Sequence, residues 1–382
     1  MSKIRNNHNV YVLGAGFSAA RGLPVMSTFM FSIRDAHEWL IREGRTAEAA
    51  SVERVLDFRL KSTPSAYRVR LDLENIEELF SLASAIDDSL ADDIRTAVAA
   101  TLDHSQSVNA APVTRFNLET GGPFVPEGLK AEVVQPGMTP NSSHLQMPTY
   151  QFMVSALLGR LSPPRSGMTN ALLSFNYDTL VEEALSAQEE QFSYGFPART
   201  VTEDETAARL SLVSEPQLSV LKLHGSTNWA FPRSQGQRLK IFGSYSDIRQ
   251  REFVPELIPP TWRKSLDGPL SYVWKSALAE ISRATRIVVI GFSMPLTDLH
   301  FKYLLAAGLR ENISLREIVF VNSNVDSIKG RVGELFGDFN RRPVIRMVHL
   351  DARNFIAGGT FDSSVGSIGR PLHPSFLQVF HT

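Results

Sequence analysis

Six short segments of the chain carry consecutive apolar, mostly β-branched residues and end in a glycine, serine, asparagine or aspartate. They span residues 10–16, 171–178, 218–226, 286–293, 317–324 and 344–352. Continuous apolar runs are typical of parallel strands buried on both faces, and the polar ends are typical of the carboxyl edge of such a sheet. Segments with helical spacing alternate with these runs, which predicts an α/β fold built on a doubly wound, Rossmann-like parallel sheet.

Three segments show the helical spacing most clearly. They span residues 32–44, 73–102 and 178–190. In the last of these, four apolar residues fall on one face: Leu180, Val181, Ala184 and Leu185. Asp178 stands near the start of this segment, where a carboxylate is favoured.

The sheet is predicted to be interrupted by two insertions. The stretch between the first two strands is too long for a simple crossover, so an inserted helical module is expected over residues 35–169. Within it, residues 104–149 are rich in Pro, Gly, Ser and Asn and lack periodicity, which indicates a surface excursion. Together with the helical module around them, these residues are expected to cover the site or contact a partner. A smaller insertion is expected over residues 231–280. The nucleotide-binding domain is then assembled from residues 1–34, 170–230 and 281–382.

The first apolar run leads into Gly14, Gly16 and Ala19, which match the dinucleotide-binding pattern G-x-G-x-x-A. The glycines permit a tight turn, and the following helix would present N–H groups to a pyrophosphate. The pattern alone is weak, because a strand-to-helix turn without a ligand has the same sequence. A dehydrogenase would need a second strand that ends in an acidic residue about 20 positions later. Asp35 and Glu38 stand near that distance but inside a helical pattern. The sequence therefore lacks the acidic strand end that a dehydrogenase needs.

Polar residues also follow the second and third strands. Asn176 and Asp178 come after one, and His224 comes after the other, ahead of Gly225. Side chains of these types can position a water, take up a proton and bind ribose hydroxyls. Helix capping by Asn176 and Asp178, and a structural role for His224, remain open as alternatives.

Taken in order, these motifs resemble those of the sirtuin (Sir2) superfamily. They are Gly14-Ala15-Gly16-x-Ser18, Gly22-Leu23-Pro24, Asn176-x-Asp178, His224-Gly225-Ser226, Gly291-x-Ser293 and Asn322. The resemblance implies a Sir2-like fold that uses NAD+ as a substrate, with Asn176 and His224 as the catalytic residues. It also implies that NAD+ is contacted by Gly14, Ala15, Gly16, Phe17, Ser18, Leu23, Pro24, Asp178, Gly225, Gly291, Phe292, Ser293 and Asn322.

The chain departs from the protein-deacylating sirtuins at two places. Those proteins carry two cysteine pairs that bind a structural zinc, whereas this chain has no cysteine, so no zinc-binding module and no metal are expected. Residues 22–27 read Gly-Leu-Pro-Val-Met-Ser and lack the Asp and Arg usual in acyl-lysine sirtuins. The segments VPELIPPTWRK and IGFSMPLTDLHF are instead similar to the bacterial Sir2-like branch of anti-phage defence effectors. That resemblance implies NAD+ hydrolysis to nicotinamide and ADP-ribose, a homo-oligomer and a HerA-type ATPase partner.

Composition narrows the remaining choices. The 39 lysines and arginines against 40 acidic residues give a net charge of −1, so no global field favours nucleic acid or an anionic membrane. The first ten residues lack the apolar core of a signal peptide, and no apolar stretch approaches the ~20 residues that span a bilayer, so a cytoplasmic protein is expected. A non-catalytic sensor of NAD+ or ADP-ribose derivatives and a zinc-free deacylase or ADP-ribosyltransferase remain alternatives. Asn176 and His224 together favour the hydrolase, because a sensor would not need both.

Overall fold

The computed structural model describes residues 7–117, 132–134, 144–159, 168–197, 200–213, 218–232, 238–249, 253–258, 268–294, 299–336 and 343–356. Side chains are described for these residues except at positions 115–117, 132–134, 144–147 and 299. Parts of the segments singled out above therefore lie outside the described residues, among them 1–6, 118–131, 135–143, 233–237, 250–252, 259–267, 295–298 and 357–382.

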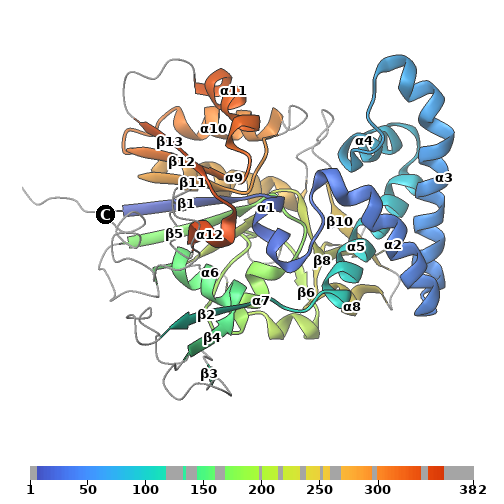
Figure 1. Cartoon of the computed structure of the whole chain (residues 1–382), viewed down its shortest axis with the longest axis horizontal. Coiled ribbons are helices and arrows are strands. Elements are labelled where there is room, and N and C mark those ends of the chain that lie inside the picture. The colour runs from blue at the N-terminus through green and yellow to red at the C-terminus, as the bar shows by residue number, and fades with distance from the viewer. Residues whose placement is uncertain are drawn as a thin grey trace, which may run out of the picture.

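A six-stranded sheet forms the centre of the molecule (Figure 1). Its strands are β1 (Asn7–Leu13), β5 (Met168–Ser174), β7 (Ser219–Lys222), β11 (Arg286–Ile290), β12 (Glu317–Asn322) and β13 (Val344–His349). They lie in the order β13-β12-β11-β1-β5-β7, and every neighbouring pair is parallel. This is the strand order of a doubly wound Rossmann sheet, so the predicted fold class is confirmed.

Each of the six predicted apolar runs forms one of these strands, and most of the polar residues at its end lie beyond the strand. β1 stops at Leu13, β5 stops at Ser174, and β7 stops at Lys222. The apolar residues stay in the sheet because the sheet buries both of their faces; the described residues of β7 are all buried, for example. Gly14, Asn176 and His224 therefore stand in loops at the carboxyl edge, and Gly14 lies at the point between β1 and β11 where the strand order reverses.

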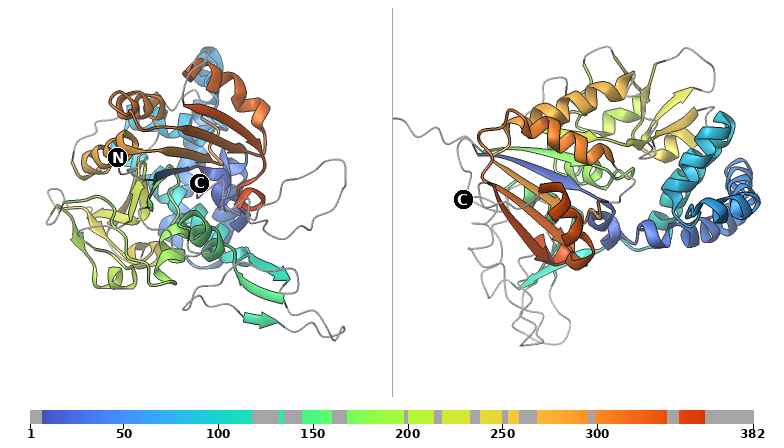
Figure 2. Two further views of the ribbon diagram at one scale, coloured as in Figure 1. Left: turned by 90° about the vertical axis from the view of Figure 1, so that its left-hand side faces the viewer. Right: turned by 90° about the horizontal axis from the view of Figure 1, so that it is seen from above.

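Helices lie on both faces of this sheet (Figure 2). They are α6 (Thr149–Leu157), α7 (Leu180–Ser186), α9 (Pro269–Arg283), α10 (Leu299–Leu309), α11 (Val325–Phe336) and α12 (Ala352–Ile356). α9 packs on α10 and on strands β7 and β1, whereas α6 packs on α7 and α12. In α7, the four residues predicted to share a face are all buried, as the spacing indicated.

Four helices between β1 and β5 form a bundle at one end of the sheet (Figure 1). They are α2 (Phe29–Arg42), α3 (Thr46–Val69), α4 (Ile76–Ile86) and α5 (Asp88–Val108), and α5 packs against the other three. The single helical stretch expected over 73–102 is two helices, because the Asp87 side chain accepts a hydrogen bond from the backbone N–H of Ser89 and starts α5. Helix α3, which contains Pro64, was not identified from the sequence.

A small sheet joins the third strand to this helical bundle. It is built from β6 (Thr202–Glu203), β8 (Gly225–Pro232), β9 (Lys240–Ile241) and β10 (Phe253–Leu257), with α8 (Tyr245–Arg249) beside it. β10 runs antiparallel to β8 and packs against α5. The remaining elements are the sheet of β2 (Val113–Asn117), β4 (His144–Pro148) and β3 (Glu132–Val134), and 3₁₀ turns at Ala19–Arg21, Met26–Thr28 and Glu205–Arg209.

Hydrogen bonds and ion pairs connect the helical bundle to the small sheet. The hydroxyl of Tyr245 donates to Oε1 of Glu48 at 2.7 Å, and Arg249 pairs with Asp103 at 3.2 Å. Arg45 pairs with both of these carboxylates. The network fixes how α3 and α5 sit relative to α8. It thereby also places the part of the bundle that forms a wall of the site described below.

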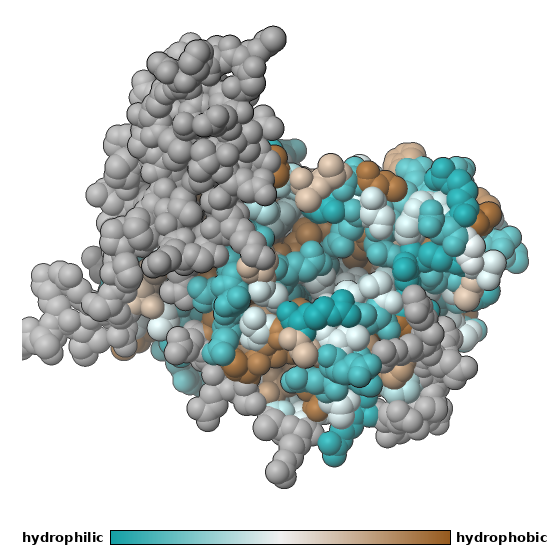
Figure 3. All heavy atoms as spheres, turned by 90° about the horizontal axis from the view of Figure 1, so that it is seen from below, coloured by the Kyte–Doolittle hydropathy of each residue, from teal (hydrophilic) through white to brown (hydrophobic). Residues whose placement is uncertain are grey.

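On the face shown in Figure 3, the described surface is mainly hydrophilic, with hydrophobic residues in small separate groups. Among the described helices, none combines the length and the apolar character needed to cross a bilayer.

Candidate active site at the carboxyl edge of the sheet

A cavity of about 790 Å³ lies between the carboxyl edge of the central sheet and helices α4 and α5. Loops after β1, β5, β7, β11, β12 and β13 contribute to one side of it. The predicted site residues that line it are Ala15, Gly16, Ser18, Leu23, Pro24, Asn176, Asp178, His224, Gly291, Phe292, Ser293 and Asn322. The structure thus brings together at one cavity residues that lie about 300 positions apart in the chain.

The glycine turn after β1 is locked to the turn after β11. The backbone N–H of Gly16 donates to the carbonyl of Gly291 at 2.8 Å, and that of Gly14 donates to Ile290 at 3.0 Å. A Cβ on Gly16 would lie 2.8 Å from the Cα of Gly291. A Cβ on Gly14 would lie 2.5 Å from the Cα of Phe292. The close backbone approach that the motif permits is therefore made to another turn of the protein.

The helix that follows, α1 (Ala15–Ser18), has four residues. The backbone N–H of Phe17 donates to the carbonyl of Gly14 at 2.8 Å, so together with the bonds of Gly14 and Gly16 three amides of the turn are engaged within the protein. The pyrophosphate contact expected at this turn would have to use other donors along the cavity.

Three of the predicted contact residues do not line the cavity: Gly14, Phe17 and Gly225. The ring of Phe17 is buried against Tyr150, with centroids 5.7 Å apart, and the Tyr150 hydroxyl donates to the Phe17 carbonyl at 2.9 Å. Burial raises the pKa of Tyr150, so its hydroxyl stays protonated. Gly225 has φ +84°, and a Cβ there would lie 1.9 Å from the carbonyl oxygen of Glu256. Its conformation is required by the packing of β10 on β8.

The side-chain amide of Asn176 has one defined orientation. Its Nδ2 donates to the carbonyl of Gly14 and to Oγ of Ser18, both at 2.9 Å. A carbonyl oxygen can only accept, so the NH₂ group must face Gly14, and its two protons are then used. The Oδ1 of Asn176 receives no hydrogen bond from the part of the chain that the structure describes. Asn176 therefore offers the cavity an acceptor and not a donor.

Ser18 connects Asn176 to Asp178. Its hydroxyl, which is 2% exposed as a residue, donates to Oδ2 of Asp178 at 2.7 Å while it accepts from Asn176. The other oxygen of Asp178 accepts from the backbone N–H of Leu180 at 3.2 Å at the start of α7. The hydroxyl of Ser18 thus aligns the Asn176 amide, and Asp178 accepts from the first N–H of α7 from the position before the N-cap residue, Thr179.

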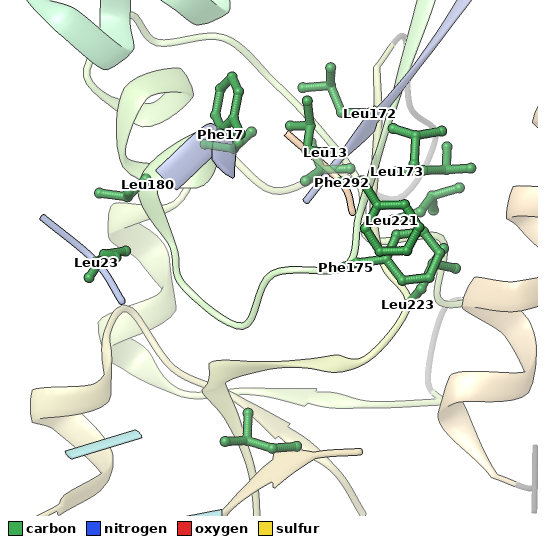
Figure 4. Packing of buried hydrophobic residues seen from close by; sticks show 14 of the residues in the cluster. Leu13, Phe17, Leu23, Leu172, Leu173, Phe175, Leu180, Leu221, Leu223 and Phe292 are labelled. Atoms are coloured by element: carbon green, nitrogen blue, oxygen red, sulfur yellow. The ribbon is translucent and has the colours of Figure 1, made fainter. Parts of the chain in front are cut away.

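His224 is buried among aromatic rings. Phe175 meets it edge-on with centroids 5.0 Å apart, and Tyr177 lies at 6.2 Å. Phe175 is stacked on Phe292 with centroids 4.6 Å apart, and the two lie against each other in Figure 4. The backbone is held on both sides, since the carbonyl of His224 accepts from Ile258 at 2.8 Å and that of Leu223 accepts from Nε1 of Trp274 at 3.0 Å. These rings give the imidazole a fixed place at the cavity.

The loop that carries Asn176 is tied to the strands on either side of His224. The backbone N–H of Leu223 donates to the carbonyl of Ser174 at 2.9 Å, and that of Thr227 donates to Tyr177 at 2.9 Å. The separation between Asn176 and His224 is therefore set by backbone hydrogen bonds between two neighbouring strand ends.

At the far end of the cavity, Asn322 and Ser293 belong to well-bonded turns. Oδ1 of Asn322 accepts from the backbone N–H of Asn324 at 2.8 Å, and the carbonyl of Ser293 accepts from Arg331 at 2.6 Å. The hydroxyl of Ser293 is on an exposed residue and lines the cavity. Turn formation and ligand contact are compatible at both positions.

The charge of the lining is one-sided. Among the described residues that line the cavity there are five carboxylates and no lysine or arginine; the carboxylates are Asp72, Glu74, Glu77, Asp178 and Asp351. Such a lining stabilises positive charge and offers a phosphate only N–H groups, hydroxyls and amides. Within the described ranges, no three His, Asp or Glu side chains are grouped so as to hold a metal ion.

The helical module was expected to cover the site together with residues 104–149, and the helical bundle does form one wall of the cavity. This wall includes Phe80 on α4 and Val98 and Leu102 on α5. None of the described residues of 104–149 lines the cavity. The apolar spacing over 73–102 indicated a buried face, but spacing does not say which element packs against it.

Residues 170–332 match the family model described as a SIR2-like domain, which spans β5 to α11 and includes Asn176 and His224. No curated protein matches the chain. Among solved structures, a mutant Sir2 homologue in complex with ADP-ribose is 12% identical, with 99% of this chain and 93% of that chain covered and a TM-score of 0.40. A complex of Sir2, p53 peptide and NAD+ is 12% identical, with 92% and 91% covered and a TM-score of 0.35.

Proposed function

We propose that this chain, whose residues 170–332 match a SIR2-like domain, is an NAD+ hydrolase. It would cleave the bond between C1′ of the ribose and the nicotinamide nitrogen and release nicotinamide and ADP-ribose. The observation that carries the proposal is that Asn176 and His224, from the neighbouring strands β5 and β7, line one cavity at the carboxyl edge of the sheet. The family match supports NAD+ as the substrate, and the choice of hydrolysis rests on the chemistry below.

The reaction needs little acid catalysis. The oxygen of a water bonds to C1′ while the C1′–N bond breaks, and the electron pair of that bond passes to the nicotinamide ring. Nicotinamide then leaves as a neutral molecule, and one proton of the water must be taken up. The transition state has oxocarbenium character, as in other glycoside cleavage. The protein has to supply a fixed pocket, an aligned water and a proton acceptor.

Asn176 is suited to align the water or a ribose hydroxyl. Because both protons of its amide are used on Gly14 and Ser18, Oδ1 is the atom it can present to a substrate. An acceptor at this place orients an O–H group and so directs the lone pair of a water toward C1′.

His224 is suited to take up the proton, directly or through a ribose hydroxyl. An imidazole with an unperturbed pKa of ~6.5 accepts a proton near neutral pH. The rings of Phe175 and Tyr177 keep its plane in place, which reduces the reorganisation needed during the reaction. The carboxylates of the lining also favour the reaction, because they stabilise the positive charge that develops on the ribose.

The wider role that we propose is depletion of NAD+ in bacterial anti-phage defence by a cytoplasmic homo-oligomer with a HerA-type ATPase partner. It rests on the resemblance of residues 254–264 and 290–301 to the defence branch. Mass by light scattering and NAD+ turnover, each measured with and without the product of the adjacent gene, test it. A fast monomer whose turnover no partner changes would contradict this role.

The hydrolase itself is tested with purified protein and NAD+, alone and with an acetylated peptide, by following nicotinamide and acetyl-ADP-ribose. Asn176→Ala and His224→Ala should each lower nicotinamide release at least ~100-fold. Asn7→Ala, at the amino edge of β1, and His349→Ala, on the exposed end of β13, are matched controls and should keep the rate.

Three results would contradict the proposal. Wild-type rates in both folded site variants would refute the assignment of the site. Acetyl-ADP-ribose that forms only with peptide would identify a deacylase. Tight NAD+ binding without any nicotinamide release would identify a sensor.

A further inference from the structure

A lysine and a glutamate form an ion pair in the interior behind the Asn176 loop. Lys222, the last residue of β7, is 1% exposed, and Glu182 on α7 is fully buried. The Nζ of Lys222 lies 3.3 Å from Oε1 of Glu182 and also donates to the backbone carbonyl of Asp178. Lys222 stands two residues before His224, and Asp178 stands two residues after Asn176. The pair therefore touches the segments that carry both proposed catalytic residues.

The pair continues into a buried polar chain. The hydroxyl of Tyr194 donates to Oε1 of Glu182 at 3.4 Å, and Nδ2 of Asn228 donates to the Tyr194 hydroxyl at 3.3 Å. Burial raises the pKa of Glu182, and the charge of Lys222 opposes that rise. Removing either partner would leave the other as an unpaired polar group in the interior, so the two side chains depend on each other.

Stability alone does not explain this arrangement. A buried ion pair loses the hydration of two charges, and well-packed apolar residues of similar volume are often as stable or more so. What apolar residues could not provide is a donor to the carbonyl of Asp178. Next to it, the carbonyl of Tyr177 is held by the backbone N–H of Thr227 at 2.9 Å. Two consecutive carbonyls of the loop are thus anchored to the strand segment that contains His224.

We propose that the Lys222–Glu182 ion pair is a positioning device for the catalytic loop: by holding the carbonyl of Asp178, it keeps Asn176 in place at the cavity beside His224. Its effect on catalysis rests on the proposed NAD+ hydrolysis, whereas its effect on the loop does not. Neither residue lines the cavity, so both act through Asn176.

The decisive variant removes both charges at once. Lys222→Met or Glu182→Leu alone leaves one buried charge unpaired and is expected to unfold the protein, whereas the double variant Lys222→Met/Glu182→Leu should fold. We expect kcat for NAD+ to fall about 10- to 100-fold, because the loop loses one anchor and Asn176 its alignment. KM should change less than about threefold, since the lining residues are unaltered.

A comparison with Asn176→Ala separates positioning from general damage. If the pair acts through Asn176, removing it from the Asn176→Ala protein should lower kcat no further. Equal losses in both backgrounds would overturn the proposal. Glu280→Gln is the matched control, because it alters a buried carboxylate that pairs with Arg283 and lies 2.8 Å from Nε2 of His8, at the amino ends of the strands. It should lower stability and leave kcat of the folded protein unchanged.

Hydrogen exchange of the ligand-free protein gives a readout that needs no turnover. In the double variant, amide exchange over residues 175–180 should rise at least about tenfold, while exchange over β5 (Met168–Ser174) stays as in the wild type. Unchanged exchange over 175–180 would overturn the positioning role whatever the activity. If the double variant exchanges faster but the wild-type protein cleaves no NAD+, the positioning role stands and the proposed function is refuted.

Discussion

The orientation of the Asn176 amide can be tested by Asn176→Asp, which keeps the shape of the side chain and replaces its NH₂ group by oxygen. In the wild type, Nδ2 donates to Gly14 and Ser18 at 2.9 Å each. The new carboxylate would face a carbonyl oxygen and a hydroxyl whose proton is already given to Asp178. Two hydrogen bonds are lost and an acceptor is left facing acceptors, so we expect a loss of about 2–4 kcal/mol in the free energy of unfolding at pH 7.

The same geometry fixes the sign of the pH dependence. The protonated carboxyl can donate to Gly14, whereas the charged form is repelled by that carbonyl and by Asp178, so the pKa of the new carboxyl is raised in the folded protein. The folded state then binds the proton more tightly than the unfolded state. The stability penalty should therefore grow by about 1.4 kcal/mol per pH unit above the unfolded pKa of ~3.9, until pH reaches the folded pKa.

Urea unfolding at pH 5 and pH 7.5, followed by tryptophan fluorescence, measures this penalty. Asn176→Ala is the control, because it loses the same hydrogen bonds without adding a titrating group, so its penalty should not depend on pH. If Asn176→Asp were as stable as the wild type at pH 7.5, or became more stable as the pH rose, the amide would not face Gly14. Oδ1 would then not be the atom that Asn176 presents to the cavity.

Four further predictions concern Gly225, Tyr245, His104 and the removal of metal ions. Gly225→Ala should lower the unfolding temperature, because positive φ alone costs about 1–2 kcal/mol and the new Cβ would meet the Glu256 carbonyl at 1.9 Å; wild-type thermal stability would contradict it. Tyr245→Phe should lose about 1–2 kcal/mol in urea unfolding, since Glu48 loses a donor at 2.7 Å, and an unchanged midpoint would show that this contact contributes nothing. Burial lowers the pKa of His104, so the folded state binds its proton less tightly and stability should fall as pH drops below ~6.5; His104→Gln should reduce the difference between pH 7 and pH 5. EDTA should change neither the unfolding temperature nor NAD+ turnover, and coupled loss of both would reveal a bound metal.

The central sheet could be predicted because most of its strands are buried on both faces. A run such as residues 286–293 is apolar without alternation, which is typical of a parallel strand covered on both sides. Helix α3 was missed because the apolar spacing of its buried face is weak. Its buried residues are mostly small, among them Ala49, Ser51 and Ala66, and they give weak spacing.

The site could be predicted in part. The order of strand ends brought Asn176 and His224 to one edge, because carboxyl ends of parallel strands meet there. The partner of each group could not be predicted. The same G-x-G pattern permits close approach of a pyrophosphate or of another turn, and the structure shows that Gly16 approaches Gly291. Likewise, the sequence allowed the Asn176 amide to donate and accept, and only its contacts show that the donors are used.

The interlocked glycine turns divide the cavity into two kinds of surface. Its floor at Gly16 and Gly291 is main chain packed on main chain, so most side-chain substitutions elsewhere leave its shape alone. The opposite wall is made of side chains on α4 and α5, such as Phe80 and Leu102, which can be exchanged one at a time. Natural variation or directed evolution could therefore retune which ligand is accepted by altering the helices, while the surface that supports the chemistry is inherited unchanged.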